Sequence, residues 1–173
     1  MKWKSLSILV IAFLCIISCK KECTDYPTDG KSILDGKYTV TGTLVDLSAP
    51  TISATGPKEY HLRTISPTVV EFFPVELGIL GHLILSGTSL SYYGSFGIIV
   101  TFDRTTNKIT NITNSYGQPS INGRYAILDP SGVNAWDPAT KTIKIKYWMD
   151  EPAVIKPHRT AFDETWTYIG ARE

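Results

Sequence analysis

Carboxylates are the side chains of this sequence with the clearest potential for catalysis. Two of them could act as the acid and base of glycoside hydrolysis if folding brought them together. The candidates are Glu71, Glu76, Asp150, Glu151, Asp163 and Glu164. Asp150-Glu151 stands before Pro152 and is typical of a strand that ends in a loop, and Asp163-Glu164 is typical of a strand start. We therefore predict no catalytic residues and no enzymatic activity.

The histidines and cysteines show no metal-binding pattern. His61, His82 and His158 are far apart in the chain, and the sequence has no His-Glu-x-x-His motif and no paired cysteines. We predict neither a metal nor another cofactor.

Glu71 has two possible orientations. Alternation places it on an apolar face with Val69 and Phe73, where a carboxylate would need a partner such as Arg63 or Arg124. If the register is shifted by one residue, Glu71 faces water instead. The sequence leaves both orientations open.

Trp148 is the best candidate for a ligand contact. Within 142–149, the apolar residues occupy every second position, which puts Trp148 on the opposite face with Lys144 and Lys146. An exposed indole can stack on the C–H face of a sugar, while Lys146 and Asp150 bind its hydroxyls. The alternatives are that a loop or neighbouring strand covers Trp148, or that it anchors a protein partner.

Tyr92 and Tyr93 are a second candidate contact. They lie in a stretch rich in serine and glycine, Ser91–Ser95, and two successive rings of an extended chain point in opposite directions. We expect one of them to be exposed at the rim of a ligand site.

The elements that would carry these residues are strands. Gly36–Val45 alternates between apolar and polar residues, as a half-buried antiparallel strand does. Clusters of Gly, Pro, Asn and Asp separate it from similar segments at 59–65, 68–74, 82–85, 96–102, 108–113, 124–128, 142–149 and 165–169. Asp103 and Asp137 each begin a tight hairpin turn.

Sequential hairpins in a chain of this length predict an all-β fold. We favour a single antiparallel, up-and-down, lipocalin-like barrel over a two-layer sandwich, because a barrel leaves no exposed sheet edges. Large residues are expected to fill its interior: Tyr38, Phe73, Phe96, Phe102 and Tyr125.

The N-terminus carries a different signal. Lys2 and Lys4 precede an apolar run that is shorter than the ~20 residues that span a bilayer, and the run ends in Ile16-Ile17-Ser18-Cys19. This ending resembles the lipobox of bacterial lipoproteins, which implies cleavage before Cys19 and lipid on its thiol. The alternative is an uncleaved anchor. We predict a signal peptide at 1–18, a flexible tether at 19–32 and one β domain at 33–173.

Composition excludes some partners. The chain has 17 basic and 16 acidic residues, two of the basic ones lie within 1–18, and the remainder therefore carries a net charge of −1. Such a balance does not indicate a nucleic-acid-binding protein. Cys23 is the third cysteine and would be left alone in the mature chain, either as an inert thiol or paired between chains.

Several segments together resemble small envelope lipoproteins of Bacteroidetes. They are the lipobox, the tether, the opening at 36–46, the stretch at 132–143 and the ending at 159–170. The resemblance implies an outer-membrane location, and neighbours of the SusC/SusD type that capture and import glycans. It specifies neither a ligand nor a side of the membrane.

Three functions follow as expectations. The first is a non-catalytic glycan-binding accessory protein, anchored to the membrane through Cys19. The second is a carrier of an apolar ligand inside a hollow barrel. The third is a structural or assembly subunit of an envelope complex, with no small ligand.

Overall fold

The computed structural model describes residues 29–49, 52–74, 81–86 and 89–172. In these ranges the secondary structure is all β, and no helix there is long and apolar enough to cross a membrane. The strands are β1 (Gly36–Asp46), β2 (Ile52–Ser66), β3 (Val69–Pro74), β4 (Gly81–Ser86), β5 (Ser89–Gly94), β6 (Ile98–Phe102), β7 (Ile109–Asn114), β8 (Tyr125–Leu128), β9 (Ala135–Asp137), β10 (Thr142–Glu151) and β11 (Ile155–Gly170).

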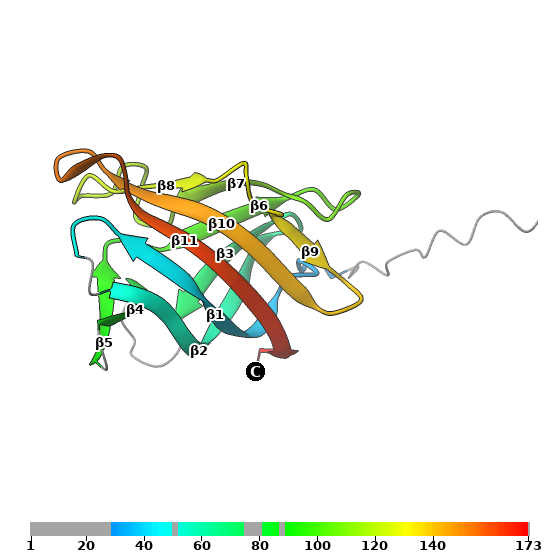
Figure 1. Cartoon of the computed structure of the whole chain (residues 1–173). Coiled ribbons are helices and arrows are strands. Elements are labelled where there is room, and N and C mark those ends of the chain that lie inside the picture. The colour runs from blue at the N-terminus through cyan, green and yellow to red at the C-terminus, as the bar shows by residue number, and fades with distance from the viewer. Residues whose placement is uncertain (1–28, 50–51, 75–80, 87–88, 173) are drawn as a thin grey trace, which may run out of the picture.

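The strands form one antiparallel sheet that curls into a nearly closed barrel (Figure 1). Its order is β7-β6-β3-β2-β1-β11-β10-β8. With the short β4, β5 and β9 left aside, strands that follow one another in the chain are paired, except that β7 and β8 form the two ends of the order; the first and last strands, β1 and β11, also pair. The β4–β5 hairpin pairs with the first half of β2, and β9 pairs with the start of β10. The predicted up-and-down barrel is thus confirmed.

The two ends of the barrel differ in the segments that they hold. At one end β1 begins and β11 ends, next to the turn between β9 and β10, and we call it the terminal end. The far end holds the turn between β10 and β11 and the end of β1 (Figure 1). β10 runs from the terminal end to the far end.

β1 lies at the centre of the sheet because both of its edges are paired over most of its length. Tyr38, Val40 and Leu44 point inward and are at most 2% exposed, as the alternation predicts. Gly42 lies at a register shift, where a Cβ would stand 2.2 Å from the carbonyl oxygen of Asp163 on β11. Only glycine allows β1 and β11 to approach this closely.

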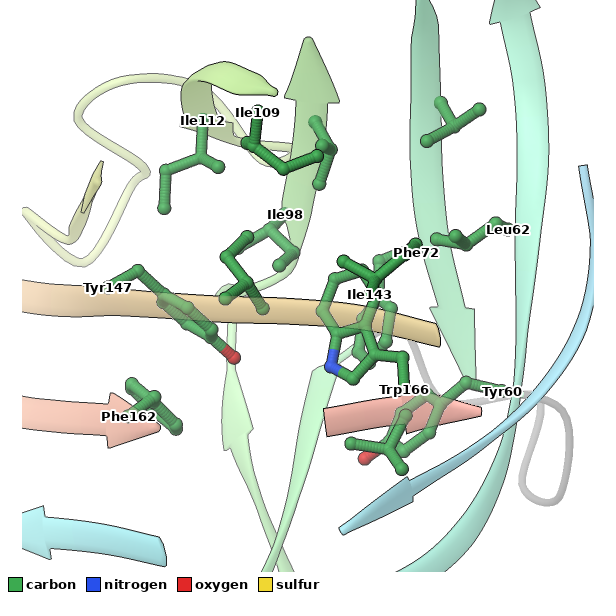
Figure 2. Close-up of a cluster of buried hydrophobic side chains, with 14 of the residues drawn as sticks. Tyr60, Leu62, Phe72, Ile98, Ile109, Ile112, Ile143, Tyr147, Phe162 and Trp166 are labelled. Carbon is green, nitrogen blue, oxygen red and sulfur yellow. The ribbon is translucent and has the colours of Figure 1, made fainter. Parts of the chain in front are cut away.

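Aromatic rings fill the described interior (Figure 2). Tyr60, Phe72 and Trp166 form one stack, with ring centroids 4.2 and 4.6 Å apart. Tyr147 stacks on Phe162 at 4.6 Å with the two ring planes 8° apart. Stacked rings contribute about 0.5–1.5 kcal/mol per pair beyond the area that they bury. The core therefore holds the barrel together from inside.

Side-chain amides bridge the seam where β7 meets β8. The Gln118 Oε1 accepts from the backbone amides of Asn114 on β7, at 2.9 Å, and of Ala126 on β8, at 3.0 Å. Its Nε2 donates to the Ala126 carbonyl at 2.7 Å. The side-chain amide of Asn114 in turn donates to the backbone carbonyl of Arg124. The side-chain amide of Gln118 thus supplies the hydrogen bonds that the backbone of a neighbouring strand supplies elsewhere in the sheet.

The structure decides two of three expectations about side chains that could face the interior. Val70 and Phe72 are buried, so Glu71 faces outward and pairs with Arg63; this decides between its two orientations. The side chain of Phe73, which was expected inside the barrel, lies outside the described residues. Tyr125, expected inside, is only half-buried.

Two strands were missed. β5 lies in the Ser/Gly-rich stretch, and β9 is a three-residue strand where only a hairpin start was expected. β11 begins ten residues before its predicted start at 165.

Candidate functional site

The outer face of β10 carries the residues that the sequence singled out. Ile143, Ile145, Tyr147 and Met149 point inward and are at most 1% exposed. The alternate side chains, Lys144, Lys146, Trp148 and Asp150, therefore lie on the outside of the barrel. Antiparallel pairing with β11 supplies the neighbours of this row.

Trp148 is half-buried because a histidine covers one face of its ring. His158 of β11 stacks on the indole with the ring centroids 3.9 Å apart and the planes 5° apart. The His158 Nδ1 lies 2.6 Å from the Asp150 Oδ1, so Asp150 fixes the tilt of the imidazole. Trp148, His158 and Asp150 thus form one rigid group at the far end of β10.

The sequence did not identify His158 as part of this group. Its position depends on an irregular register of β10 and β11 beyond Met149. The alternation of apolar and polar residues does not indicate such an irregularity, so the contact between His158 and Trp148 could not be predicted from the sequence.

Lys146 lies in the middle of the row and forms an ion pair with β11. Its Nζ is 3.1 Å from the Asp163 Oδ2, and the two residues face each other in the sheet register. The two side chains are 39% and 57% exposed. An exposed pair of this kind adds little stability, so both groups remain available to a ligand.

A hollow of about 420 Å³ opens on the same side of the sheet towards the terminal end. It is lined by Val133, Ala135, Asp137, Thr140, Thr142, Lys144 and Thr165. A chain of polar groups runs along it: the Thr140 hydroxyl donates to the Asp137 Oδ2 at 2.8 Å and lies 2.8 Å from the Thr142 hydroxyl. The hollow therefore offers hydroxyls, a carboxylate and an ammonium beside small apolar groups.

The turn between β9 and β10 builds one wall of the hollow. Asp137 begins this turn as predicted, and its Oδ1 accepts from the Ala139 amide at 2.9 Å. Hydrogen bonds from Thr140 and Ala139, together with the charge of Lys144, hold the pKa of the Asp137 carboxyl below its ordinary value. Asp137 therefore stays ionised at neutral pH and accepts hydrogen bonds.

An apolar row crosses the far-end part of the same face. Val45 on β1 pairs with Ala161 on β11, and Ala161 pairs with Trp148 on β10. Val45 is 58% exposed, and Leu47, which follows the end of β1, is 57% exposed. Trp148 thus has an apolar neighbour in each flanking strand, Ala161 on β11 and Ile127 on β8, and its polar neighbours Lys146 and Asp150 lie along β10.

Tyr93 does not belong to this surface. It is 4% exposed and lies inside the barrel at the far end, where its hydroxyl donates to Asp46. Arg159 bonds both Ser48 and Glu151 there, and Arg124 shares Glu151. Tyr93 is therefore part of a buried charge network, which leaves none of its ring for a surface ligand.

The structure brings together three of the proposed ligand residues: Lys146, Trp148 and Asp150 share one outer face, with His158 added. The side chain of Tyr92 lies outside the described residues, and so does Cys19. Among the described residues no group of three or more histidine, cysteine or acidic side chains could hold a metal ion.

Comparisons of this chain with protein-family models, with curated proteins and with solved structures find no match.

Proposed function

We propose that this protein is a lipid-anchored, non-catalytic glycan-binding protein of the bacterial outer membrane. The observation that carries the proposal is the hollow on the outer face of β9, β10 and β11, lined with hydroxyls and a carboxylate, on the same face as Trp148. A polar hollow beside an aromatic ring suits a ligand with many hydroxyls and flat C–H faces.

Sugar hydroxyls both donate and accept hydrogen bonds, and the hollow offers groups of both kinds. The ionised Asp137 only accepts, Lys144 only donates, and the threonine hydroxyls do either. The small side chains Val133 and Ala135 leave room for a sugar ring. A second sugar ring would stack on the face of Trp148 that His158 does not cover.

The membrane anchor rests on the sequence around Cys19. The expected result is a mature chain that begins at Cys19 and carries lipid, as measured by mass spectrometry of the membrane fraction. A Cys19→Ala protein should stay uncleaved and lose its lipid. Normal cleavage and lipidation of that variant would overturn the anchor.

A carrier of an apolar ligand fits the described interior poorly. Tyr60, Phe72, Trp166, Tyr147 and Phe162 stack within it and occupy the space that such a ligand would need. The outer face is the better place to look for a ligand.

Glycan binding is tested by retention of the protein in gels that contain polysaccharides. Trp148→Ala should weaken the affinity roughly 5- to 150-fold, the equivalent of the ~1–3 kcal/mol that stacking on an aromatic ring contributes in nucleic-acid complexes. Thr142→Val should also weaken it, because it removes a hydroxyl from the hollow. Thr110→Val, an exposed change on β7, is the matched control. Failure of the unmutated protein to bind a broad polysaccharide panel would overturn the proposal.

A second candidate is an assembly subunit of an envelope complex, favoured by the exposed Val45 and Leu47 at the far end of the barrel. In that case Val45→Asp should release the protein from a complex purified from its own envelope, and glycan retention should be absent. If Val45→Asp leaves both assembly and glycan retention intact, the apolar row serves neither function.

A further inference from the structure

Building on the proposed function, we infer that the ligand is an uncharged glycan longer than a disaccharide, bound along the outer face of β10 from the hollow to Trp148. The inference rests on two independent features of this face: the distance between its two contact regions, and the way its charges are matched.

The two contact regions lie at different heights on the same strand. Lys144 and Thr142 line the hollow, and Trp148 lies four and six residues farther along β10. At ~3.4 Å per residue these separations are about 14 and 20 Å. A disaccharide fills one of the two regions and does not reach the other. Only a longer chain gains both the hydroxyl contacts and the stacking contact.

The space between the two regions is open to such a chain. Lys146 and Asp163 lie there, both partly exposed and paired with each other. The Lys146 ammonium donates, and the Asp163 carboxylate accepts, so the hydroxyls of a sugar between the two ends meet both kinds of group.

The charges along this path are matched in pairs. Two lysines and one histidine on this path each have a carboxylate beside them, and that carboxylate repels an anion whether or not the histidine is protonated. Lys144 lies near enough to Asp137 to favour its ionised form, Lys146 pairs with Asp163, and His158 pairs with Asp150.

This matching selects against acidic glycans. A uronate or sulfate group brought to Lys146 would compete with Asp163 and be repelled by it, and the same holds at the other two pairs. A neutral hydroxyl meets no such repulsion. Recognition of a polyanion would need cations without carboxylate neighbours, and it would weaken steeply with salt.

The first test is a length series of one neutral oligosaccharide, from the disaccharide to the hexasaccharide, taken from the polysaccharide that the unmutated protein binds best. Affinity measured by calorimetry should rise by about tenfold or more as the chain grows to span both regions, and then level off. Trp148→Ala should abolish this rise. Equal affinity for the disaccharide and the hexasaccharide would overturn the inference.

The second test concerns charge. The unmutated protein should bind the neutral polysaccharide equally well at about 0.1 and 0.5 M salt, and should bind a polyuronate more weakly. Asp163→Asn leaves Lys146 without its carboxylate and should raise polyuronate affinity several-fold at low salt only. Glu59→Gln removes a carboxylate from β2, on another part of the barrel, and is the matched control.

The outcomes separate the inference from the proposed function. Tighter binding of the polyuronate by the unmutated protein would overturn the inference and leave glycan binding standing. An unchanged preference in Asp163→Asn would show that the ion pair does not set the selectivity, which also overturns it. Absence of binding to every neutral and acidic glycan would overturn the proposed function itself.

Discussion

At the scale of single residues, the most unusual group is the carboxylate of Glu164 inside the barrel. Glu164 is 1% exposed, and its Oε2 accepts from the Tyr147 hydroxyl at 2.8 Å and from the Trp166 indole N–H at 2.9 Å. Tyr147 and Trp166 belong to the two aromatic stacks of the core. One oxygen thus fixes the relative position of both stacks, and it satisfies two donors that the core would otherwise bury unpaired.

Replacing Glu164 should test this role. Glu164→Leu fills a similar volume but removes the acceptor, and each donor left unsatisfied costs about 1–3 kcal/mol. We expect a loss of about 2–6 kcal/mol in the free energy of unfolding, measured by urea denaturation. Glu164→Gln keeps a carbonyl oxygen and should lose less. Equal stability of Glu164→Leu and the unmutated protein would show that the carboxylate does not organise the core.

Asp46 gives the fold a defined response to acid. Burial raises the pKa of Asp46, but hydrogen bonds from Tyr93 and Ser48 and the charge of Arg159 lower it by more, so it lies below its ordinary value. A carboxyl whose pKa is lowered by folding stabilises the protein above its unfolded pKa of ~3.8, and this contribution is lost as the pH falls through the folded value.

The expected result is a fall in the urea midpoint as the pH is lowered from about 5 to about 2. Asp46→Asn should be less stable than the unmutated protein at neutral pH and should lose less on acidification. Asp35, whose pKa is also lowered, remains in the variant and preserves part of the response. Parallel curves for the two proteins would contradict the assignment to Asp46.

At the scale of elements, the seam between β7 and β8 is the place where the barrel depends on a side chain. Gln118→Ala should remove three hydrogen bonds to Asn114 and Ala126 and expose an edge of β8. At about 0.5–1.5 kcal/mol each, their loss should lower stability by about 1.5–4.5 kcal/mol.

Hydrogen exchange is the sharper measurement for this change. The Ala126 amide should lose protection in Gln118→Ala, while the amides of β1, which is paired on both edges, should follow global stability alone. Gln118→Glu keeps the acceptor and loses the donor, and it should give an intermediate result. Unchanged protection at Ala126 would mean that the seam is held by other contacts.

Alternation of apolar and polar residues predicts those strands that have one buried face and one solvent-exposed face. β1 and β10 are of this kind, and their inward and outward residues follow the sequence pattern. β11 departs from the pattern because the charged Glu164 points inward, where it accepts hydrogen bonds from Tyr147 on β10 and Trp166 on β11. β5 carries too few apolar residues to indicate a strand, and it exists because β4 lies beside it.

The candidate site was predictable to the extent that it depends on one strand. Lys146, Trp148 and Asp150 share a face because their spacing along β10 requires it. His158, Asp163 and the hollow depend on which strands become neighbours and in what register. These strand pairings follow from the complete fold, and no local pattern in the sequence indicates them.

At the scale of the whole molecule, the segment just before β1 and the segment just after β11 meet at the terminal end of the barrel. Leu34 is fully buried in the core, and Ser32 is 3% exposed with its amide bonded to Thr64. Asp35 accepts from Arg172 at 2.8 and 3.1 Å. The residues just before β1 therefore belong to the folded domain, together with the residues just after β11.

Truncation should locate this boundary. A chain that begins at Asp29 should retain the stability of the longer protein. A chain that begins at Gly36 loses the buried Leu34, worth about 1.5–3 kcal/mol, as well as the bonds of Asp35. It should show a lower urea midpoint with the same β-rich circular dichroism. Equal midpoints for the two chains would place the boundary after Leu34.

The central position of β1 has a mechanical consequence. If lipid holds the chain at Cys19 and a polysaccharide pulls on the outer face of β10, the load enters at the start of β1 and acts along that strand. β1 is bonded to β2 on one edge and to β11 on the other, and β11 is bonded to β10. The hydrogen-bond ladders on the loaded path therefore bear the force in shear, many hydrogen bonds at once, and the domain resists unfolding under this load.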